Sequence, residues 1–179
     1  AQYTPVHPCL AEGYMTDLHL AFVSEGMIYY RRRPAIGMAW EAATSVVAGD
    51  YPCITIPPDN CPVMCYETSG NTAWLRTQDH GLTWEAVGMA TSGLYPMAAE
   101  ANGIQYLVTY TSGVGHVIRR SQDYFSTLLG FGTATSALVV AAGSCNAERV
   151  GFLKLDASGR MLWTAVPDGS RVNHYGSYD

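Results

Sequence analysis

The stretch RTQDHGLTWEA, residues 76–86, decides how this chain folds. Two hydroxyls, a carboxylate, a glycine and a tryptophan fall within eight positions: Thr77, Asp79, Gly81, Thr83 and Trp84. Asp and Thr oxygens accept hydrogen bonds from the backbone N–H groups of tight turns, and glycine supplies the positive φ that such turns need. These residue types suit a structural turn between two strands, and they would also suit a small polar site.

The same stretch recurs with a period of 44 residues. GLTWEA at 81–86 repeats GMAWEA at 37–42, and GDYP at 49–52 recurs as GLYP at 93–96. Three arginines keep the same spacing: Arg32, Arg76 and Arg120. Several markers at one period, with no insertion between them, indicate a structural repeat.

Weaker copies of the turn follow in the later units. SQDYFSTL keeps a hydroxyl, the Asp and the Thr, and loses the Gly and the Trp: Ser121, Asp123 and Thr127. A partial copy at Asp168 lies one place out of register. We expect four units in a single domain over residues 1–179, at 5–48, 49–92, 93–136 and 137–179.

Each unit contains short runs rich in β-branched and aromatic residues, separated by Pro, Asn, Asp and Gly, which is typical of strands. The second unit contains four such runs: PCITIP, VMCYET, TAWLRT and TWEAVGM. In the other units, predicted strands include AWEAAT at 39–44, at the end of the first unit, STLLGF at 126–131, at the end of the third, and ALVVAA at 137–142, at the start of the fourth. Four strands in each repeat of about 40–45 residues predict a propeller blade. The expected fold is an all-β propeller of four antiparallel four-stranded blades, either complete or a segment of a larger propeller.

Composition excludes several classes of partner. The chain has 179 residues, of which 48% are hydrophobic and only 14% are charged, and its net charge is −5. Nucleic acids and anionic membranes attract basic surfaces, so neither is an expected partner. No apolar run approaches the roughly 20 residues of a membrane helix. So few charges predict a surface covered by Ser, Thr, Gly, Asn and Tyr, or by a partner.

The five cysteines form no zinc-binding pattern, because no second pair stands at zinc-finger spacing: Cys9, Cys53, Cys61, Cys65 and Cys145. We expect them to be small buried side chains. If one disulfide forms, Cys53 and Cys65 are the expected partners across a hairpin. No metal or cofactor is expected.

The pattern T-x-D-x-G-x-T-W at residues 77–84 resembles the Asp box of the sialidase-like, or BNR-repeat, β-propellers. The resemblance implies a turn between the third and fourth strands of a blade, with Asp79 accepting backbone hydrogen bonds. We also expect Trp84 and Trp40 to pack in the core, and His80 to be exposed to solvent, because neighbouring side chains in a tight turn point apart. An Asp repeated from blade to blade indicates a repeated local fold and not repeated chemistry.

Sialidases of this family are expected to use an arginine triad, a Tyr nucleophile paired with a Glu, and an acidic acid/base residue. Arg32, Arg76 and Arg120 lie just before the Asp position of each box, at the end of the blade that is remote from the family's catalytic face. We therefore expect them to cover strands or to pair with carboxylates. Tyr66 and Glu67 are adjacent on a strand and point to opposite faces, so they do not form a catalytic couple.

The candidate binding face is the opposite end of the blades, where the second and third strands are joined. Its turns are short and polar, and they supply six candidate residues: Glu25, Ser69, Asn71, Ser112, Asp156 and Arg160. Catalytic pockets on propellers need longer loops to exclude water, so the face is expected to be shallow.

Three functions follow. The first is a non-catalytic binding or assembly module that recognises a surface glycan or a partner protein; the resemblance implies an extracellular or virion setting, such as a phage tail. The alternative is a fragment of a sialidase-like glycoside hydrolase whose catalytic residues lie outside this chain. The third is a pure scaffold. Four units leave no strand to lock a ring, so we expect contact with other subunits or with the rest of a longer chain.

Overall fold

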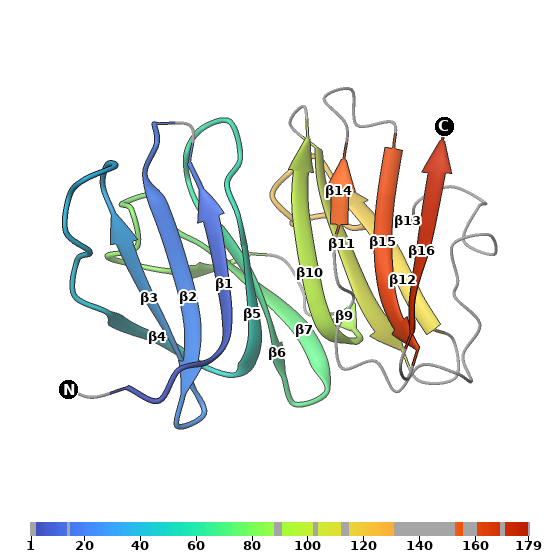
Figure 1. The fold of residues 1–179 in the computed structure, drawn as a ribbon, viewed down its shortest axis with the longest axis horizontal. Helices are drawn as coiled ribbons and strands as arrows, with labels where there is room; N and C mark the ends of the chain where they lie inside the picture. Colours follow the sequence, from blue (N-terminus) through green and yellow to red (C-terminus); the bar gives the residue numbers. More distant parts are fainter. Residues whose placement is uncertain are drawn as a thin grey trace.

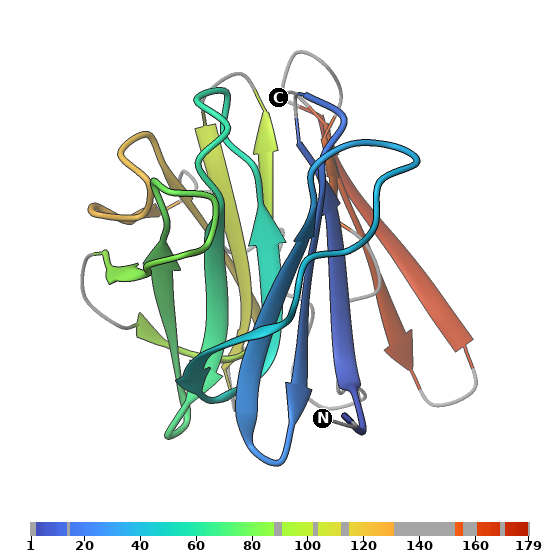
Figure 2. The same cartoon turned by 90° about the vertical axis from the view of Figure 1, so that its left-hand side faces the viewer.

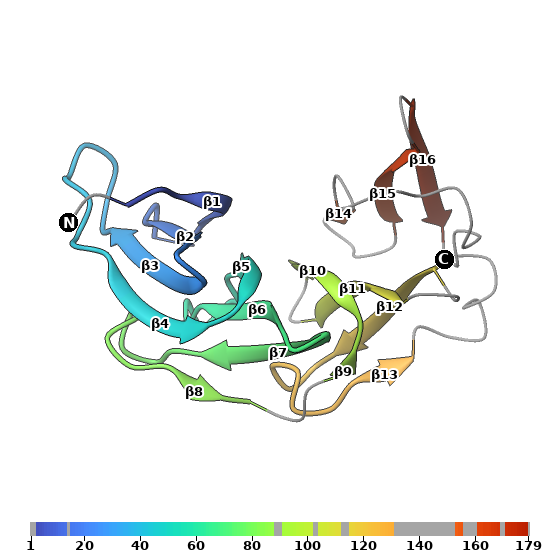
Figure 3. The same ribbon diagram turned by 90° about the horizontal axis from the view of Figure 1, so that it is seen from below.

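The protein is all-β, as predicted. The computed structural model describes residues 3–13, 15–87, 91–101, 104–111, 115–130, 153–155, 161–168 and 171–178. Within these residues it contains strands and no helix, and the strands form four antiparallel sheets in chain order (Figure 1). The sheets follow one another around an arc, with the first strand of each on the inner side (Figure 3).

Each sheet is built from strands that are consecutive in sequence. The first sheet contains β1 (Val6–Glu12), β2 (Leu18–Ser24), β3 (Met27–Arg33) and β4 (Thr44–Ala48). The second contains β5 (Asp50–Thr55), β6 (Val63–Thr68), β7 (Asn71–Arg76) and β8 (Glu85–Ala86), and β9 (Thr91–Ser92) pairs with the other end of β7. The third contains β10 (Leu94–Ala101), β11 (Ile104–Thr111), β12 (Gly115–Ser121) and β13 (Leu129–Gly130). The fourth contains β14 (Leu153–Leu155), β15 (Met161–Asp168) and β16 (Arg171–Tyr178).

The outer strands differ from the sequence prediction. AWEAAT at 39–44 is not a strand, and β4 begins at its last residue, Thr44. Figure 2 shows the connection from β3 to β4, in lighter blue, extending away from the sheet. Predicted outer strands in the next two units shrink to the two-residue strands β8 and β13. The predicted strand at 137–142 lies outside the described residues.

Two-residue turns set the register of the central hairpins. Glu25 and Gly26 join β2 to β3, and Ser69 and Gly70 join β6 to β7. All four residues have positive φ, between 49° and 78°. Paired positive φ values are the signature of the type I′ turn, whose twist matches that of antiparallel strands.

The second residue of each inner strand in the first three sheets is an aromatic residue in the left-handed region, directly before a proline. His7, Tyr51 and Tyr95 have φ values of 48°, 47° and 51°. At each of them the pairing between the first and second strand shifts register, which marks a β-bulge. A bulge re-aims its side chain, and the repeat therefore turns three aromatic side chains in the same way.

The core lies between neighbouring sheets. One cluster joins the first two sheets, with Ile28, Tyr30, Ile54 and Met64 among its buried members. Another joins the second and third sheets: Val63, Cys65, Trp74, Leu107 and Phe125.

Cysteine sulfur atoms connect the inner strands of neighbouring sheets. The N–H of Ile54 donates to Cys9 Sγ at 3.3 Å, and the N–H of Ala98 donates to Cys53 Sγ at the same distance. Cys53 and Cys65 are register partners, as predicted, but both thiols are free. The hydrogen bond with the Cys65 thiol, and to a lesser extent burial, raises the pKa of Cys53 to about 12.

Candidate functional site

The turn at residues 77–84 is held by its own side chains. Asp79 Oδ1 accepts the Thr83 N–H at 2.8 Å, and Asp79 Oδ2 accepts the Thr83 hydroxyl at 2.6 Å. The Thr77 hydroxyl donates to Asp79 Oδ1 at 2.8 Å and accepts the Gly81 N–H at 2.7 Å. Asp79 thus accepts hydrogen bonds within its own turn, as predicted. His80 is exposed to solvent, as predicted.

The third sheet repeats these bonds with fewer of the motif residues. Asp123 Oδ1 accepts the Thr127 N–H at 2.8 Å and the Ser121 hydroxyl at 2.6 Å. The Ser121 hydroxyl in turn accepts the Phe125 N–H at 2.8 Å. Carboxylates engaged in this way hold a backbone loop.

The two tryptophans are less buried than predicted, because both lie in the connections that lead to the outer strands and not on a strand. Trp84 is half-buried and packs edge-on against Tyr30, with ring centroids 5.1 Å apart. Trp40 lies outside both core clusters, with the guanidinium groups of Arg31 and Arg33 at 5.2 and 5.7 Å from its ring.

Acid should weaken the Asp79 turn. The hydroxyl and N–H of Thr83 are the main causes that lower the pKa of Asp79 to about 2. Because the folded pKa lies below the unfolded value of about 3.9, this stabilisation is complete above about pH 5 and is lost as the pH falls toward 2. Urea unfolding at pH 5, 3 and 2 should show a smaller loss of stability in Asp79→Asn than in the wild type. Glu85→Gln, exposed on the next strand, should keep the wild-type slope, and equal slopes for all three proteins would contradict the assignment.

The repeated arginines lie at the same end as these turns. Arg32 Nε donates to Asp17 Oδ2 at 3.0 Å. Arg76 donates to Asp59, and its guanidinium lies 3.8 Å from the Tyr124 ring. These two arginines pair with carboxylates, as predicted. Arg120 is exposed.

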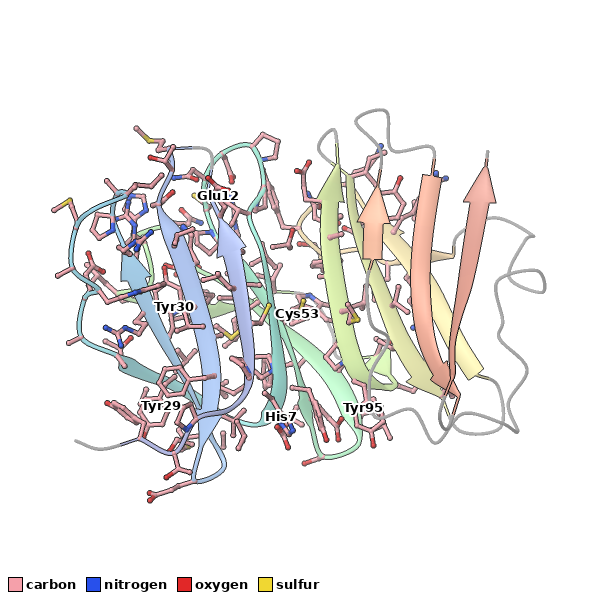
Figure 4. All side chains as sticks on the ribbon, viewed as in Figure 1. His7, Glu12, Tyr29, Tyr30, Cys53 and Tyr95 are labelled. Atoms are coloured by element: carbon pink, nitrogen blue, oxygen red, sulfur yellow. The ribbon has the colours of Figure 1, made fainter. Side chains whose placement is uncertain are left out.

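Three aromatic side chains meet at the opposite end of the inner strands. The His7 and Tyr51 rings are stacked, with centroids 4.0 Å apart and planes at 18°. Tyr51 and Tyr95 meet edge to face, with centroids 4.8 Å apart. We call these three side chains the aromatic row. Figure 4 shows His7 and Tyr95 at one end of the inner strands and Glu12 at the other.

Two carboxylates lie within the aromatic row, and we call them the carboxylate pair. Asp50 Oδ1 lies 2.5 Å from His7 Nδ1 and accepts the Tyr51 N–H at 2.8 Å. Glu67 Oε2 accepts the Tyr95 N–H at 3.2 Å. Asp50 and Glu67 are register partners on β5 and β6. The five residues combine aromatic surface with hydrogen-bonding groups, and ligand sites are commonly built in this way.

The predicted binding-face residues border this row only in part. Glu25 and Ser69 occupy the turns at the same end, and Asn71 Nδ2 donates to the Ser69 carbonyl at 3.2 Å. Ser112, Asp156 and Arg160 lie outside the described residues.

Sequence reasoning missed the aromatic row and the carboxylate pair. An aromatic residue precedes proline at one position of each of the first three units, as HP, YP and YP. This spacing indicates the repeat, and it also places three aromatic rings at equivalent positions of three units. Nothing in the sequence shows that the bulges turn those rings toward one another.

One open depression of about 430 Å³ lies at the other end of the inner strands. Glu12 and Glu100 are among its lining residues, together with Ile54, Thr55 and Ile56. In the part of the chain that the structure describes, no three His, Cys, Asp or Glu side chains are arranged to hold a metal ion. That part also lacks any helix long and apolar enough to cross a membrane.

No protein-family model matches the sequence, and no curated protein matches it. Solved structures share the fold. Trypanosoma rangeli sialidase in complex with sialic acid gives a TM-score of 0.65 at 11% identity, over 97% of this chain and 36% of the sialidase. A family 117 glycoside hydrolase from the marine bacterium Zobellia galactanivorans gives 0.63 at 11% identity, over 99% of this chain and 66% of that enzyme.

A family PL25 ulvan lyase bound to -[GlcA(1-4)Rha3S]- gives a TM-score of 0.67 at 10% identity, over 100% of this chain and 49% of the lyase. This chain therefore spans between 36% and 66% of the lengths of these three proteins. At such identities the likeness shows the fold, which is that of a sialidase-like β-propeller, as the sequence predicted.

Proposed function

We propose that this chain is part of a carbohydrate-binding β-propeller that holds a saccharide on the aromatic row without cleaving it. The observation that carries the proposal is the row itself: His7, Tyr51 and Tyr95 come from three sheets and meet beside two carboxylates. Tyrosine offers a broad apolar ring for the faces of a sugar and a hydroxyl for its polar edge. The carboxylates accept hydrogen bonds from sugar hydroxyls.

The three structural neighbours support carbohydrate as the ligand class. Each is described as an enzyme of carbohydrate chemistry, and two of them hold a saccharide. A shared fold does not transfer function, so the weight of the proposal rests on the site in this chain.

Two features of the described residues favour binding without catalysis. The repeated arginines, which a sialidase would need for the substrate carboxylate, lie at the other end of the sheets, with Arg32 and Arg76 bound to Asp17 and Asp59. In the first two sheets, the turns beside the row contain two residues each and are too short to form a wall that excludes water.

Glycoside hydrolysis is the second candidate, and the carboxylate pair favours it. Facing residues of an antiparallel pair place their side chains on the same side of the sheet, so the two carboxyl groups can lie close together. Retaining glycosidases place two carboxyl groups about 5 Å apart, and inverting enzymes place them farther apart. Asp50 and Glu67 would fill these roles if the chain were catalytic.

A glycan array followed by a hydrolysis assay tests both candidates. Tyr51→Asn and Tyr95→Asn remove the rings, while asparagine tolerates the left-handed backbone. We expect each variant to bind array glycans at least about tenfold more weakly than the wild type. Tyr124→Ala, at the opposite end, is the matched control and should bind normally.

The bound glycans should remain intact after incubation with the wild-type protein, as measured by mass spectrometry. Cleavage that disappears in Asp50→Asn would establish hydrolysis instead. Equal binding by the wild type and both Tyr variants would remove the aromatic row as the site.

A further inference from the structure

Among the first three sheets, the carboxylate pair occurs in the second alone. The 44-residue repeat places Val6 and Leu94 at the position of Asp50. In the first sheet Val6 pairs with Val23, just as Asp50 pairs with Glu67 in the second. Two apolar side chains are thus replaced by two acids at a single point of an otherwise regular repeat.

The backbone does not require these acids. His7 and Tyr95 adopt the same left-handed conformation as Tyr51, and neither follows an Asp. A repeat position whose residue is not required by the fold is free to carry a functional side chain. The carboxylate pair is therefore a feature of the site and not of the blade.

Within the described residues, the contacts of each carboxylate engage only one of its two oxygens. The contacts with the aromatic row use Oδ1 of Asp50 and Oε2 of Glu67. The Asp50 side chain is 44% exposed and that of Glu67 is half-buried. Oδ2 and Oε1 therefore remain as acceptors beside the Tyr51 and Tyr95 rings.

This end of the first three sheets carries no arginine or lysine among its described residues. All six arginines of residues 1–130 lie toward the other end of the third strands: Arg31, Arg32, Arg33, Arg76, Arg119 and Arg120. The only lysine of the chain is Lys154. Glu25 adds a third negative charge near the row. A negative surface attracts cations and opposes anionic sugars.

We infer that the aromatic row and the carboxylate pair bind an amino sugar, a hexosamine unit with a free protonated amine, and discriminate against sugar acids. This inference rests on the proposed function and specifies its ligand. The ammonium group donates to Asp50 Oδ2 and Glu67 Oε1 in charge-assisted hydrogen bonds. The Tyr51 and Tyr95 rings add cation–π attraction and pack against the sugar.

Calorimetry with three oligosaccharides tests the inference. The probes are a β-1,4-glucosamine tetrasaccharide, its N-acetylated form and an oligogalacturonate. We expect the free amine to bind at least about tenfold more tightly than the acetylated form, because acetylation removes the charge. The oligogalacturonate should bind most weakly, and added salt should weaken only the binding of the free amine.

Asp50→Asn and Glu67→Gln keep the shape and one acceptor oxygen but remove the charge. Each should reduce affinity for the glucosamine tetrasaccharide by about tenfold and leave the acetylated form unchanged. Glu85→Gln, which removes an exposed carboxylate on β8 at the other end of the sheets, is the matched control and should behave like the wild type. Circular dichroism establishes that each variant is folded.

The outcomes separate the two proposals. Equal affinity for the two tetrasaccharides, with both lost in Tyr51→Asn, would overturn the amino-sugar inference and leave the proposed function in place. Tighter binding of the oligogalacturonate would overturn it as well. Absence of binding to every saccharide, on the array and in solution, would overturn both.

Discussion

Asp17→Ala should destabilise the protein by about 3–5 kcal/mol, the cost of leaving a buried charge without its partner. Asp17 and His19 are fully buried, and the Arg32 side chain is 17% exposed. Asp17 Oδ2 accepts hydrogen bonds from His19 Nε2 and Arg32 Nε, each at 3.0 Å. Removing the carboxylate would leave both donors unsatisfied in the interior.

The Asp17 network extends to the neighbouring sheet. The Tyr30 hydroxyl lies 2.7 Å from His19 Nδ1 and 3.3 Å from the carbonyl oxygen of His80. Burial lowers the pKa of His19 against the opposing effect of Asp17, so this histidine is neutral. Burial would raise the pKa of Asp17, but His19 and Arg32 outweigh it, and the net shift is downward. The carboxylate is therefore charged, and Arg32 is the cation that it neutralises.

Urea denaturation of Asp17→Ala and Asp59→Ala measures this effect. Asp59 also binds an arginine, Arg76, but its side chain is 34% exposed. Solvent screens such a pair, so Asp59→Ala should cost no more than about 1 kcal/mol. Similar losses in the two variants would show that burial does not determine the strength of the Asp17 network.

Gly81→Ala should also lower the stability of the fold strongly. Gly81 has φ of +93°, and a Cβ placed there would lie 2.0 Å from Tyr30 Cε1. The Tyr30 ring is buried and its hydroxyl is fixed by His19, so it cannot move aside. We expect a loss of about 2–4 kcal/mol, from the positive φ and from overpacking together.

Gly37 provides the matched control, because it stands 44 residues earlier in the repeat. Its φ is +86°, and a Cβ there would meet nothing within 4 Å. Gly37→Ala should therefore lose only about 1–2 kcal/mol, from backbone strain alone. In a Tyr30→Ala background, Gly81→Ala should fall to the same cost. Equal losses for Gly37→Ala and Gly81→Ala in the wild-type background would contradict the steric explanation.

Local sequence predicted the parts of the fold that depend on local chemistry. The strand runs of the second unit recur in β5 to β7, and the Asp79 turn makes the expected hydrogen bonds. Side chains two to four residues apart can satisfy a turn without help from the rest of the chain. The predicted extents of the outer strands were wrong, because the pairing of these strands depends on neighbouring structure. Trp40 lies outside the sheet, and β8 contains only Glu85 and Ala86. The number of blades in the whole propeller and the unit boundaries stay predictions.

The sequence by itself determined the 44-residue repeat, the strand character of each unit and the side chains that hold the turns. Only the tertiary structure shows that position 81 requires a glycine. Its counterpart Phe125 also has positive φ, at 67°, so the backbone alone accepts a large residue. Phe125 packs against Trp74, with ring centroids 5.8 Å apart, whereas the Tyr30 ring occupies the equivalent space beside Gly81.

The aromatic row was likewise decided in three dimensions. His7, Tyr51 and Tyr95 are 44 residues apart in sequence, and no local rule brings them into contact. The bulges turn each ring in the same direction, and the arc of sheets then places the rings side by side. The repeat therefore determines that each of the three sheets carries one such ring, and the packing of the sheets against one another determines that the rings come into contact.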